Sequence, residues 1–330
     1  MFGSILGRNG DSGTAPASVG EDPKEQRIRI GLALGGGAAR GWAHIGVLRA
    51  LNEAGIEPDI IAGTSIGAVV GGCYIAGILD HLEAFARGLT RRRVFGLLDL
   101  NIAGSGLISG NRLGKLLTTE LGNRRIEDLP RRFVCVATEL STGHEIWMSH
   151  GNIVEAMRAS YALPGLFQPV KVGSRWLVDG ALVNPIPVSV CRALGANLVI
   201  AVNLSSDIFG RGTVVQDDET DDPSDPEQVA DVSAAVVSAT DARKILRRQL
   251  VGGNDGPPGI STVMVEAFNI IQDRIARSRL AGDPPDLMIN PKLGRIGLFE
   301  FHRAAEAIDA GHQVGKRMVA EIKDGLAGVV

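Results

Sequence analysis

Blocks of hydrophobic and polar residues alternate along the chain and predict strands and helices in turn. The apolar positions from Ile28 to Leu34 indicate a short buried strand that ends at three glycines. Residues 38–54 carry apolar side chains at helical spacing, and Gly55 stands where a helix C-cap is expected. A second strand is predicted at 59–62 and a helix of small residues at 66–79. Because a helical crossover joins parallel strands, this stretch predicts a parallel sheet.

The same alternation continues toward the C-terminus. Further strands are predicted at 133–138, 145–149, 176–178, 198–202 and 287–290, and further helices at 152–161, 187–194, 229–250, 263–281 and 302–322. Strands that alternate with helices are typical of a doubly wound α/β fold, with helices on both faces of a mostly parallel sheet.

Changes in composition divide the chain into four parts. Residues 1–26 are rich in Gly, Ser, Asp and Pro and are expected to be a disordered tail, whereas 27–206 contain the predicted α/β core. Residues 207–228 are expected to form an acidic flexible insertion, because seven carboxylates and no basic residue lie between Asp217 and Glu227. A lid or a regulatory segment is the alternative there. Residues 229–330 are expected to complete the same domain with helices.

The overall charge argues against two classes of partner. The net charge of -3 comes from 34 basic and 37 acidic residues, so no general field attracts nucleic acid or an anionic membrane, and any anion binding must be local. No apolar run of about 18 residues and no signal peptide are found. The 3 cysteines are widely spaced and form no CxxC pair, which favours reduced thiols and a cytoplasmic protein. The oligomeric state stays open.

One basic segment has two interpretations. Arg91, Arg92 and Arg93 lie beside apolar residues, a combination that can rest transiently on a membrane surface. The alternative is a solvated basic helix end next to a core segment.

A single GxSxG sequence, Gly63-Thr64-Ser65-Ile66-Gly67, falls at a predicted strand-to-helix junction. In this context the serine of such a motif sits on a sharp turn and acts as a nucleophile, with the helix N-terminus favouring negative charge. A serine that merely caps the helix is the alternative, and it leaves room for a non-enzymatic binding or regulatory protein.

The glycine run Gly35-Gly36-Gly37 should emerge at the same sheet edge as Ser65, because the two preceding strands are parallel. Its backbone amides are therefore candidates for an oxyanion hole, and Arg40 can add positive charge for substrate or anion binding. A dinucleotide loop is the alternative, but Gly41 follows at the wrong spacing and the second strand ends in Ala62-Gly63 rather than an acidic residue.

A serine nucleophile needs a base. The sequence contains 6 histidines, and His44, one helical turn after Arg40, has the position of a packing or hydrogen-bonding side chain. Asp179 is the stronger candidate, because it closes a predicted strand and precedes a glycine turn. No HExxH motif or Cys/His cluster occurs, so no metal or cofactor is expected.

In three motifs the chain resembles the patatin-like phospholipases, in their compact bacterial form. The glycine-rich loop Gly35 to Arg40, the elbow Gly63 to Gly67 and the element Asp179-Gly180-Ala181 match in order, and the likeness extends from about Ile28 to Val202. The acidic segment after residue 206 has no counterpart in this resemblance.

The resemblance implies a three-layer α/β/α fold and a Ser-Asp dyad, with Ser65 as nucleophile, Asp179 as base and later acid, and the loop glycines as oxyanion donors. It also implies a lipid ester substrate, namely a phospholipid, lysophospholipid or acylglycerol. Acyl transfer to another alcohol is the alternative outcome of the same chemistry.

Overall fold

The structure is a computed structural model that describes residues 28–90, 111–164, 166–206 and 260–328. Four predicted features lie outside these residues: the tail at 1–26, the basic segment Arg91 to Arg93, the acidic insertion at 207–228 and the helix at 229–250.

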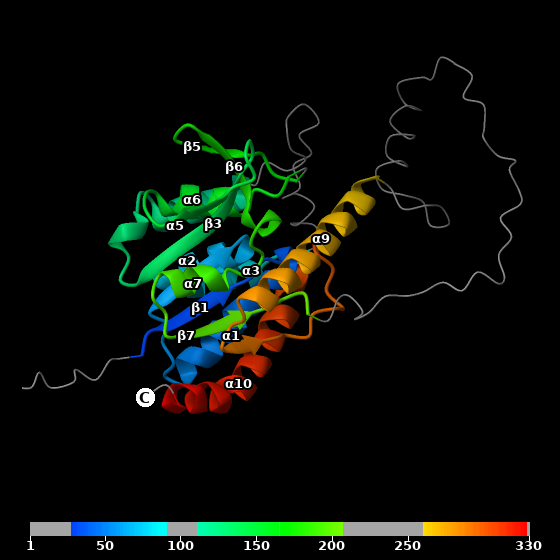
Figure 1. The fold of residues 1–330 in the computed structure, drawn as a ribbon. Helices are drawn as coiled ribbons and strands as arrows, with labels where there is room; N and C mark the ends of the chain where they lie inside the picture. Colours follow the sequence, from blue (N-terminus) through cyan, green and yellow to red (C-terminus); the bar gives the residue numbers. More distant parts are fainter. Residues whose placement is uncertain (1–27, 91–110, 165, 207–259, 329–330) are drawn as a thin grey trace, which may run out of the picture.

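A central sheet of 8 strands organises the fold (Figure 1). The strands are β1 (Ile30–Leu34), β2 (Ile60–Thr64), β3 (Arg132–Glu139), β4 (Glu145–Met148), β5 (Val170–Val172), β6 (Arg175–Asp179), β7 (Leu198–Val202) and β8 (Leu287–Ile289). They follow the order β5-β6-β3-β2-β1-β7-β8, with β4 paired to β3. The run from β3 to β8 is parallel, while β4, β5 and β6 pair antiparallel. The predicted mostly parallel sheet is thus confirmed.

Helices cover both faces of this sheet. They are the 3-10 turn η1 (Ala38–Trp42) and the helices α1 (Ala43–Glu53), α2 (Ile66–Ile75), α3 (Leu79–Arg87), α5 (Asn111–Leu121), α6 (Ile153–Ser160), α7 (Val188–Ala193), α9 (Ile260–Gly282) and α10 (Ala304–Gly328). The larger hydrophobic core packs one face against α1, α2, α6 and α10, and a smaller one packs the other face against α7 and α9. The fold therefore has the expected three layers. Every residue of β1, β2 and β7 is buried, as central parallel strands covered on both faces require.

Two helices and one strand were not among the predicted elements. Helices α3 and α5 and the strand β5 occur between the predicted elements. The three residues of β5 are too few to show a period, and their pairing with β6 in a hairpin makes them a strand.

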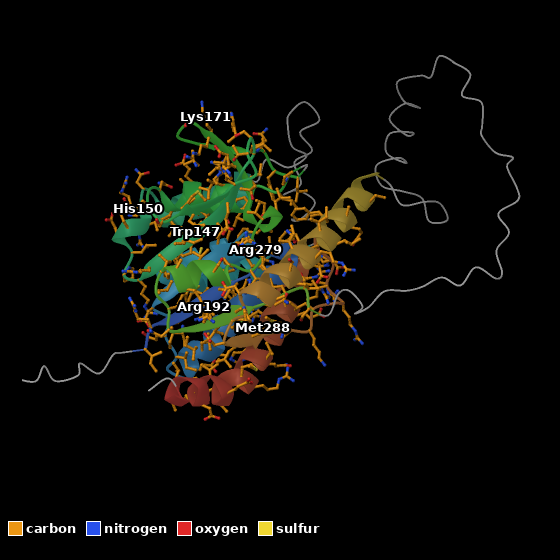
Figure 2. All side chains as sticks on the ribbon, in the orientation of Figure 1. Trp147, His150, Lys171, Arg192, Arg279 and Met288 are labelled. Carbon is orange, nitrogen blue, oxygen red and sulfur yellow. The ribbon has the colours of Figure 1, made fainter. Side chains whose placement is uncertain are left out.

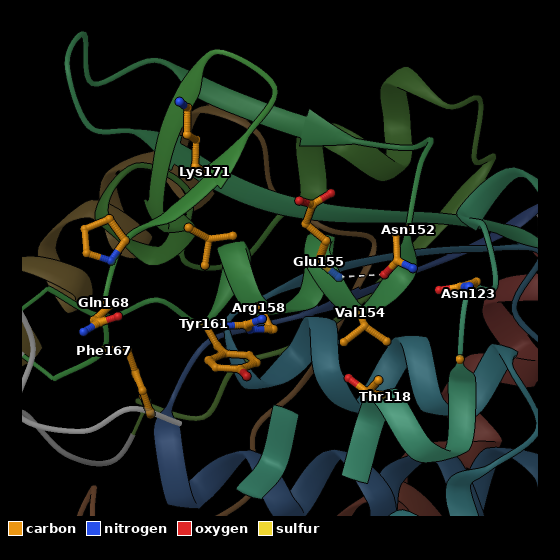
Figure 3. A pocket seen from close by; sticks show the side chains of 13 residues that line it. Thr118, Asn123, Asn152, Val154, Glu155, Arg158, Tyr161, Phe167, Gln168 and Lys171 are labelled. Atoms are coloured by element: carbon orange, nitrogen blue, oxygen red, sulfur yellow. Dashed lines mark hydrogen bonds between the residues drawn. The ribbon is translucent and has the colours of Figure 1, made fainter. Parts of the chain in front are cut away.

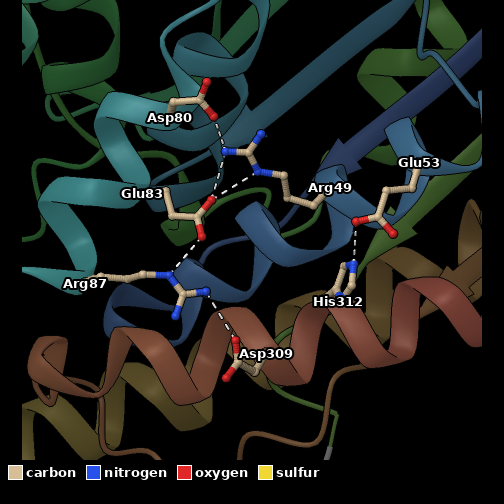
Figure 4. Close-up of polar contacts among 7 residues, drawn as sticks. All are labelled: Arg49, Glu53, Asp80, Glu83, Arg87, Asp309 and His312. Atoms are coloured by element: carbon tan, nitrogen blue, oxygen red, sulfur yellow. Dashed lines mark hydrogen bonds and ion pairs between the residues drawn. The ribbon is translucent and has the colours of Figure 1, made fainter.

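Close glycine packing holds α10 against α1. A Cβ at Gly46 would lie 1.9 Å from the Ile308 carbonyl oxygen, and one at Gly311 would lie 2.0 Å from that of Ala43. Only glycine permits this approach of two backbones. Ion pairs flank the contact (Figure 4). Arg49 of α1 pairs with Asp80 and Glu83 of α3, and Arg87 of α3 pairs with Glu83 and with Asp309 of α10, so α3 is tied to both helices. His312 of α10 lies against Glu53 of α1.

Candidate active site

Two strands meet end to end along one side of β3. Thr64, the last residue of β2, lies opposite Val136, and Asp179, the last residue of β6, lies opposite Ala137. β4 pairs with β3 over both of these positions, so β2 and β6 must share the opposite side of β3. The register therefore brings the residue after β2, which is Ser65, next to Asp179.

Ser65 and Asp179 form a direct hydrogen bond. The Ser65 hydroxyl donates to Asp179 Oδ2 over 2.6 Å, and the Ala181 amide donates to Oδ1 over 2.8 Å. Ser65 is 9% exposed and Asp179 is 1% exposed. Burial raises the pKa of Asp179 to about 7, although the hydrogen bonds from Ser65 and Ala181 oppose this rise. Near neutral pH the carboxyl group can thus both accept and release a proton.

The backbone of Ser65 is strained. Its φ of 57° and ψ of -126° are unusual for a residue with a side chain, and its hydroxyl makes no capping bond to α2. Glycine is required beside it, because a Cβ at Gly67 would lie 2.2 Å from the Leu34 carbonyl oxygen. Ser65 therefore occupies a sharp strand-to-helix turn, and its side chain faces Asp179 instead of capping the helix.

Ser160, the last residue of α6, supports this turn. Its hydroxyl accepts a hydrogen bond from the Ser65 amide over 2.9 Å and donates to the Val136 carbonyl over 2.6 Å. The side chain is completely buried. The sequence gives Ser160 no predicted role, because a serine at a helix end has no pattern that predicts a contact 95 residues away.

The glycine loop lies against the dyad, but its amides are not equivalent. A Cβ at Gly36 would lie 3.5 Å from that of Ser65, which shows how close the loop comes. The Gly35 amide donates to the Val202 carbonyl and the Gly36 amide to the Pro185 carbonyl. Hydrogen bonds within the described part of the chain therefore occupy two of the three predicted oxyanion donors.

The next two amides of the loop remain as donors. Within the described residues, neither the Gly37 amide nor the Ala38 amide donates a hydrogen bond. Ala38 has a φ of 48°, a rare conformation for alanine. Of the three predicted oxyanion donors, the Gly37 amide is therefore the one without an internal acceptor in the described residues, and the Ala38 amide follows it directly.

Two buried side chains hold the loop in place. His44 Nε2 lies 2.7 Å from the Gly35 carbonyl oxygen, and burial lowers the pKa of His44 to about 4, so the neutral ring donates to this oxygen. The Arg40 Nε donates to the Ile296 carbonyl over 2.7 Å, and Arg40 is 6% exposed. His44 is thus a structural residue of the loop, as its position in the sequence indicated. Anion binding by Arg40 stays a prediction.

A pocket of about 600 Å³ lies between α5, α6 and β5 (Figure 3). Tyr161 and Phe167, whose rings meet edge to face, contribute to its wall, and neither Ser65 nor Asp179 lines it. Tyr161 directly follows Ser160, so the end of α6 adjoins both the pocket and the nucleophile turn.

Within the same described ranges, no three His, Cys, Asp or Glu side chains group as metal ligands would. In those ranges no helix has the length and apolar character needed to cross a bilayer.

Comparison with known proteins places these features in a family. The model of the patatin-like phospholipases matches residues 32–192. An uncharacterised NTE family protein of Mycobacterium tuberculosis is 34% identical over 322 residues, which cover 86% of this chain and 89% of that protein. A protein of Emericella nidulans named lysophospholipase nte1 is 30% identical over 300 residues, or 89% of this chain and 18% of the fungal one.

Among solved structures, VipD from Legionella pneumophila aligns with a TM-score of 0.40 and 14% identity, over 89% of this chain and 67% of that one. The family match and the extensive similarity to the mycobacterial protein establish the family of this chain. The chain belongs to the patatin-like phospholipase family and is a hydrolase of carboxylic esters.

Proposed function

We propose that this protein hydrolyses acyl esters of lipids through a dyad of Ser65 and Asp179. The observation that carries the proposal is the 2.6 Å hydrogen bond between Ser65 Oγ and the buried Asp179 carboxyl group. The candidate substrates are phospholipids, lysophospholipids and acylglycerols. The name of the fungal relative, lysophospholipase nte1, makes a lysophospholipid the first substrate to test.

In the proposed reaction, the Asp179 carboxylate takes the proton of Ser65 as Oγ attacks the ester carbonyl. The carbonyl oxygen becomes an oxyanion, and the amides of Gly37 and Ala38 donate to it. Each such donor contributes about 3 kcal/mol to the transition state. Asp179 then protonates the leaving alcohol, which departs and leaves an acyl group on Ser65.

Water completes the cycle. Asp179 deprotonates a water molecule that attacks the acyl-enzyme, and the proton returns to Ser65 as the fatty acid leaves. A pKa of about 7 for Asp179 suits both directions of transfer at neutral pH. No histidine takes part, and His44 acts only by holding the Gly35 carbonyl.

A fluorophosphonate probe and a lysophospholipid assay test the proposal together. We expect the probe to label the purified protein at Ser65, and we expect Ser65→Ala to lose both labelling and fatty acid release. Asp179→Asn should lose release by several orders of magnitude while the fold is kept, as measured by circular dichroism. Full turnover by Ser65→Ala would refute the nucleophile, and full turnover by Asp179→Asn would refute the base.

A further inference from the structure

Two large apolar side chains lie exposed beyond the dyad. Leu140 is 55% exposed and Trp176 is 52% exposed. They are neighbours, because the Leu140 amide donates to the Trp176 carbonyl over 2.9 Å and continues the β3–β6 pairing past Glu139 and Leu177. Trp176 stands three positions before Asp179 on β6, a span of about 10 Å. An apolar pair therefore projects past the sheet edge at which the dyad lies.

A cation accompanies this pair. Lys171 on β5 lies directly opposite Trp176, and its Nζ is 5.9 Å from the centroid of the indole ring. Figure 2 shows Lys171 on the outer part of the hairpin, well separated from Trp147 on β4. Within the described residues, no carboxylate forms an ion pair with Lys171. The charge of Lys171 is thus available to an anionic partner beside an exposed tryptophan.

The other charges nearby leave the surface positive. Arg175 is 55% exposed and lies 3.7 Å from Glu139, whose side chain is only 13% exposed. Glu139 also accepts a hydrogen bond from the Thr142 hydroxyl, and its carboxylate offsets the charge of Arg175. His144, the other titratable residue of that turn, is exposed. The net outward charge is therefore the positive charge of Lys171.

We propose that Leu140, Lys171, Arg175 and Trp176, here called the rim, bind the surface of an anionic phospholipid bilayer. Tryptophan favours the boundary between headgroups and acyl chains, and leucine gains by leaving water. Lys171 attracts anionic headgroups, which strengthens binding about fivefold. Docking through the rim would hold the dyad about 10 Å from the lipid surface. The inference rests on the proposed lipid hydrolysis and adds the surface by which the protein would reach its substrate.

Vesicle sedimentation tests the rim without relying on catalysis. Ser65→Ala protein, which cannot consume the lipid, is mixed with vesicles of phosphatidylcholine or of phosphatidylcholine with phosphatidylserine. We expect binding to the anionic vesicles, and we expect Leu140→Ala with Trp176→Ala to weaken it about tenfold or more. Lys171→Gln should weaken it about fivefold on the anionic vesicles alone.

Trp147→Ala is the matched control, because Trp147 is 43% exposed but lies opposite Val136, four residues before Leu140 along β3. It should bind like the parent. Equal loss in Trp147→Ala and the rim variants would overturn the proposal, as would unchanged binding by the rim variants. A dimer in solution that the rim variants dissolve would assign the surface to protein contact instead.

Turnover measurements distinguish membrane binding by the rim from the proposed ester hydrolysis. With Ser65 intact, the rim variants should hydrolyse a water-soluble short-chain ester at the parental rate and vesicle lipid more slowly. Absence of all ester hydrolysis in the parent would contradict the proposed function and leave the binding result to decide the rim.

Discussion

Replacing Asp179 by Asn should make the protein more stable at neutral and alkaline pH while it loses activity. The carboxyl group is 1% exposed, and its pKa of about 7 lies well above the ordinary value of 3.8 for an aspartate. The folded protein therefore favours the protonated carboxyl group. The contribution of this group to the free energy of unfolding is complete below its pKa in the unfolded chain, and it is lost as the pH rises to its pKa in the folded protein. Asn is neutral at every pH and avoids that loss.

The magnitude follows from the two pKa values. A difference of about 3 units corresponds to about 4 kcal/mol of unfolding free energy at full ionisation. The Asn side chain can keep both hydrogen bonds, because its oxygen can accept from the Ala181 amide and its amide can donate to Ser65 Oγ. Most of the difference should therefore appear as increased stability of the variant.

Urea unfolding at several pH values measures this effect. The advantage of Asp179→Asn over the parent should grow by about 3 kcal/mol between pH 5 and pH 8. Asp128→Asn, which removes an exposed carboxylate, controls for the loss of one charge and should show no such growth. Parallel stability profiles for the parent and Asp179→Asn would refute a buried carboxyl group with a raised pKa.

Three further results are expected. The kcat/KM of the parent should rise with pH through an apparent pKa of about 7 and then level off, whereas a flat profile between about pH 6 and pH 8 would exclude Asp179 as the base. Ser160→Ala removes the hydrogen bonds to the Ser65 amide and the Val136 carbonyl, so it should lower kcat about tenfold with little change in KM. Gly311→Ala should cost about 3 kcal/mol in urea unfolding, because its Cβ would lie 2.0 Å from the Ala43 carbonyl oxygen, while Gly328→Ala, which meets nothing within 4 Å, should be neutral.

The sequence alone determined the features that depend on neighbouring residues. Buried strands covered on both faces appear as continuous apolar runs, so β1, β2 and β7 were predicted at nearly their observed positions. The elbow around Ser65 was also visible, because glycines beside a serine at a strand-to-helix junction are a local requirement of that turn. Helices α3 and α5 were missed, although both belong to the ordered core.

The tertiary structure decided how these parts meet. Ser65 and Asp179 are 114 residues apart, and only the register of β2 and β6 along β3 brings their side chains to 2.6 Å. The tertiary structure also decided which loop amides are available as donors, because the amides of Gly35 and Gly36 donate to the distant carbonyls of Val202 and Pro185. Burial, which raises the pKa of Asp179 to about 7, likewise results from packing. Local sequence encodes turns and elements, whereas pairing across the sheet sets which groups share a site and how they ionise.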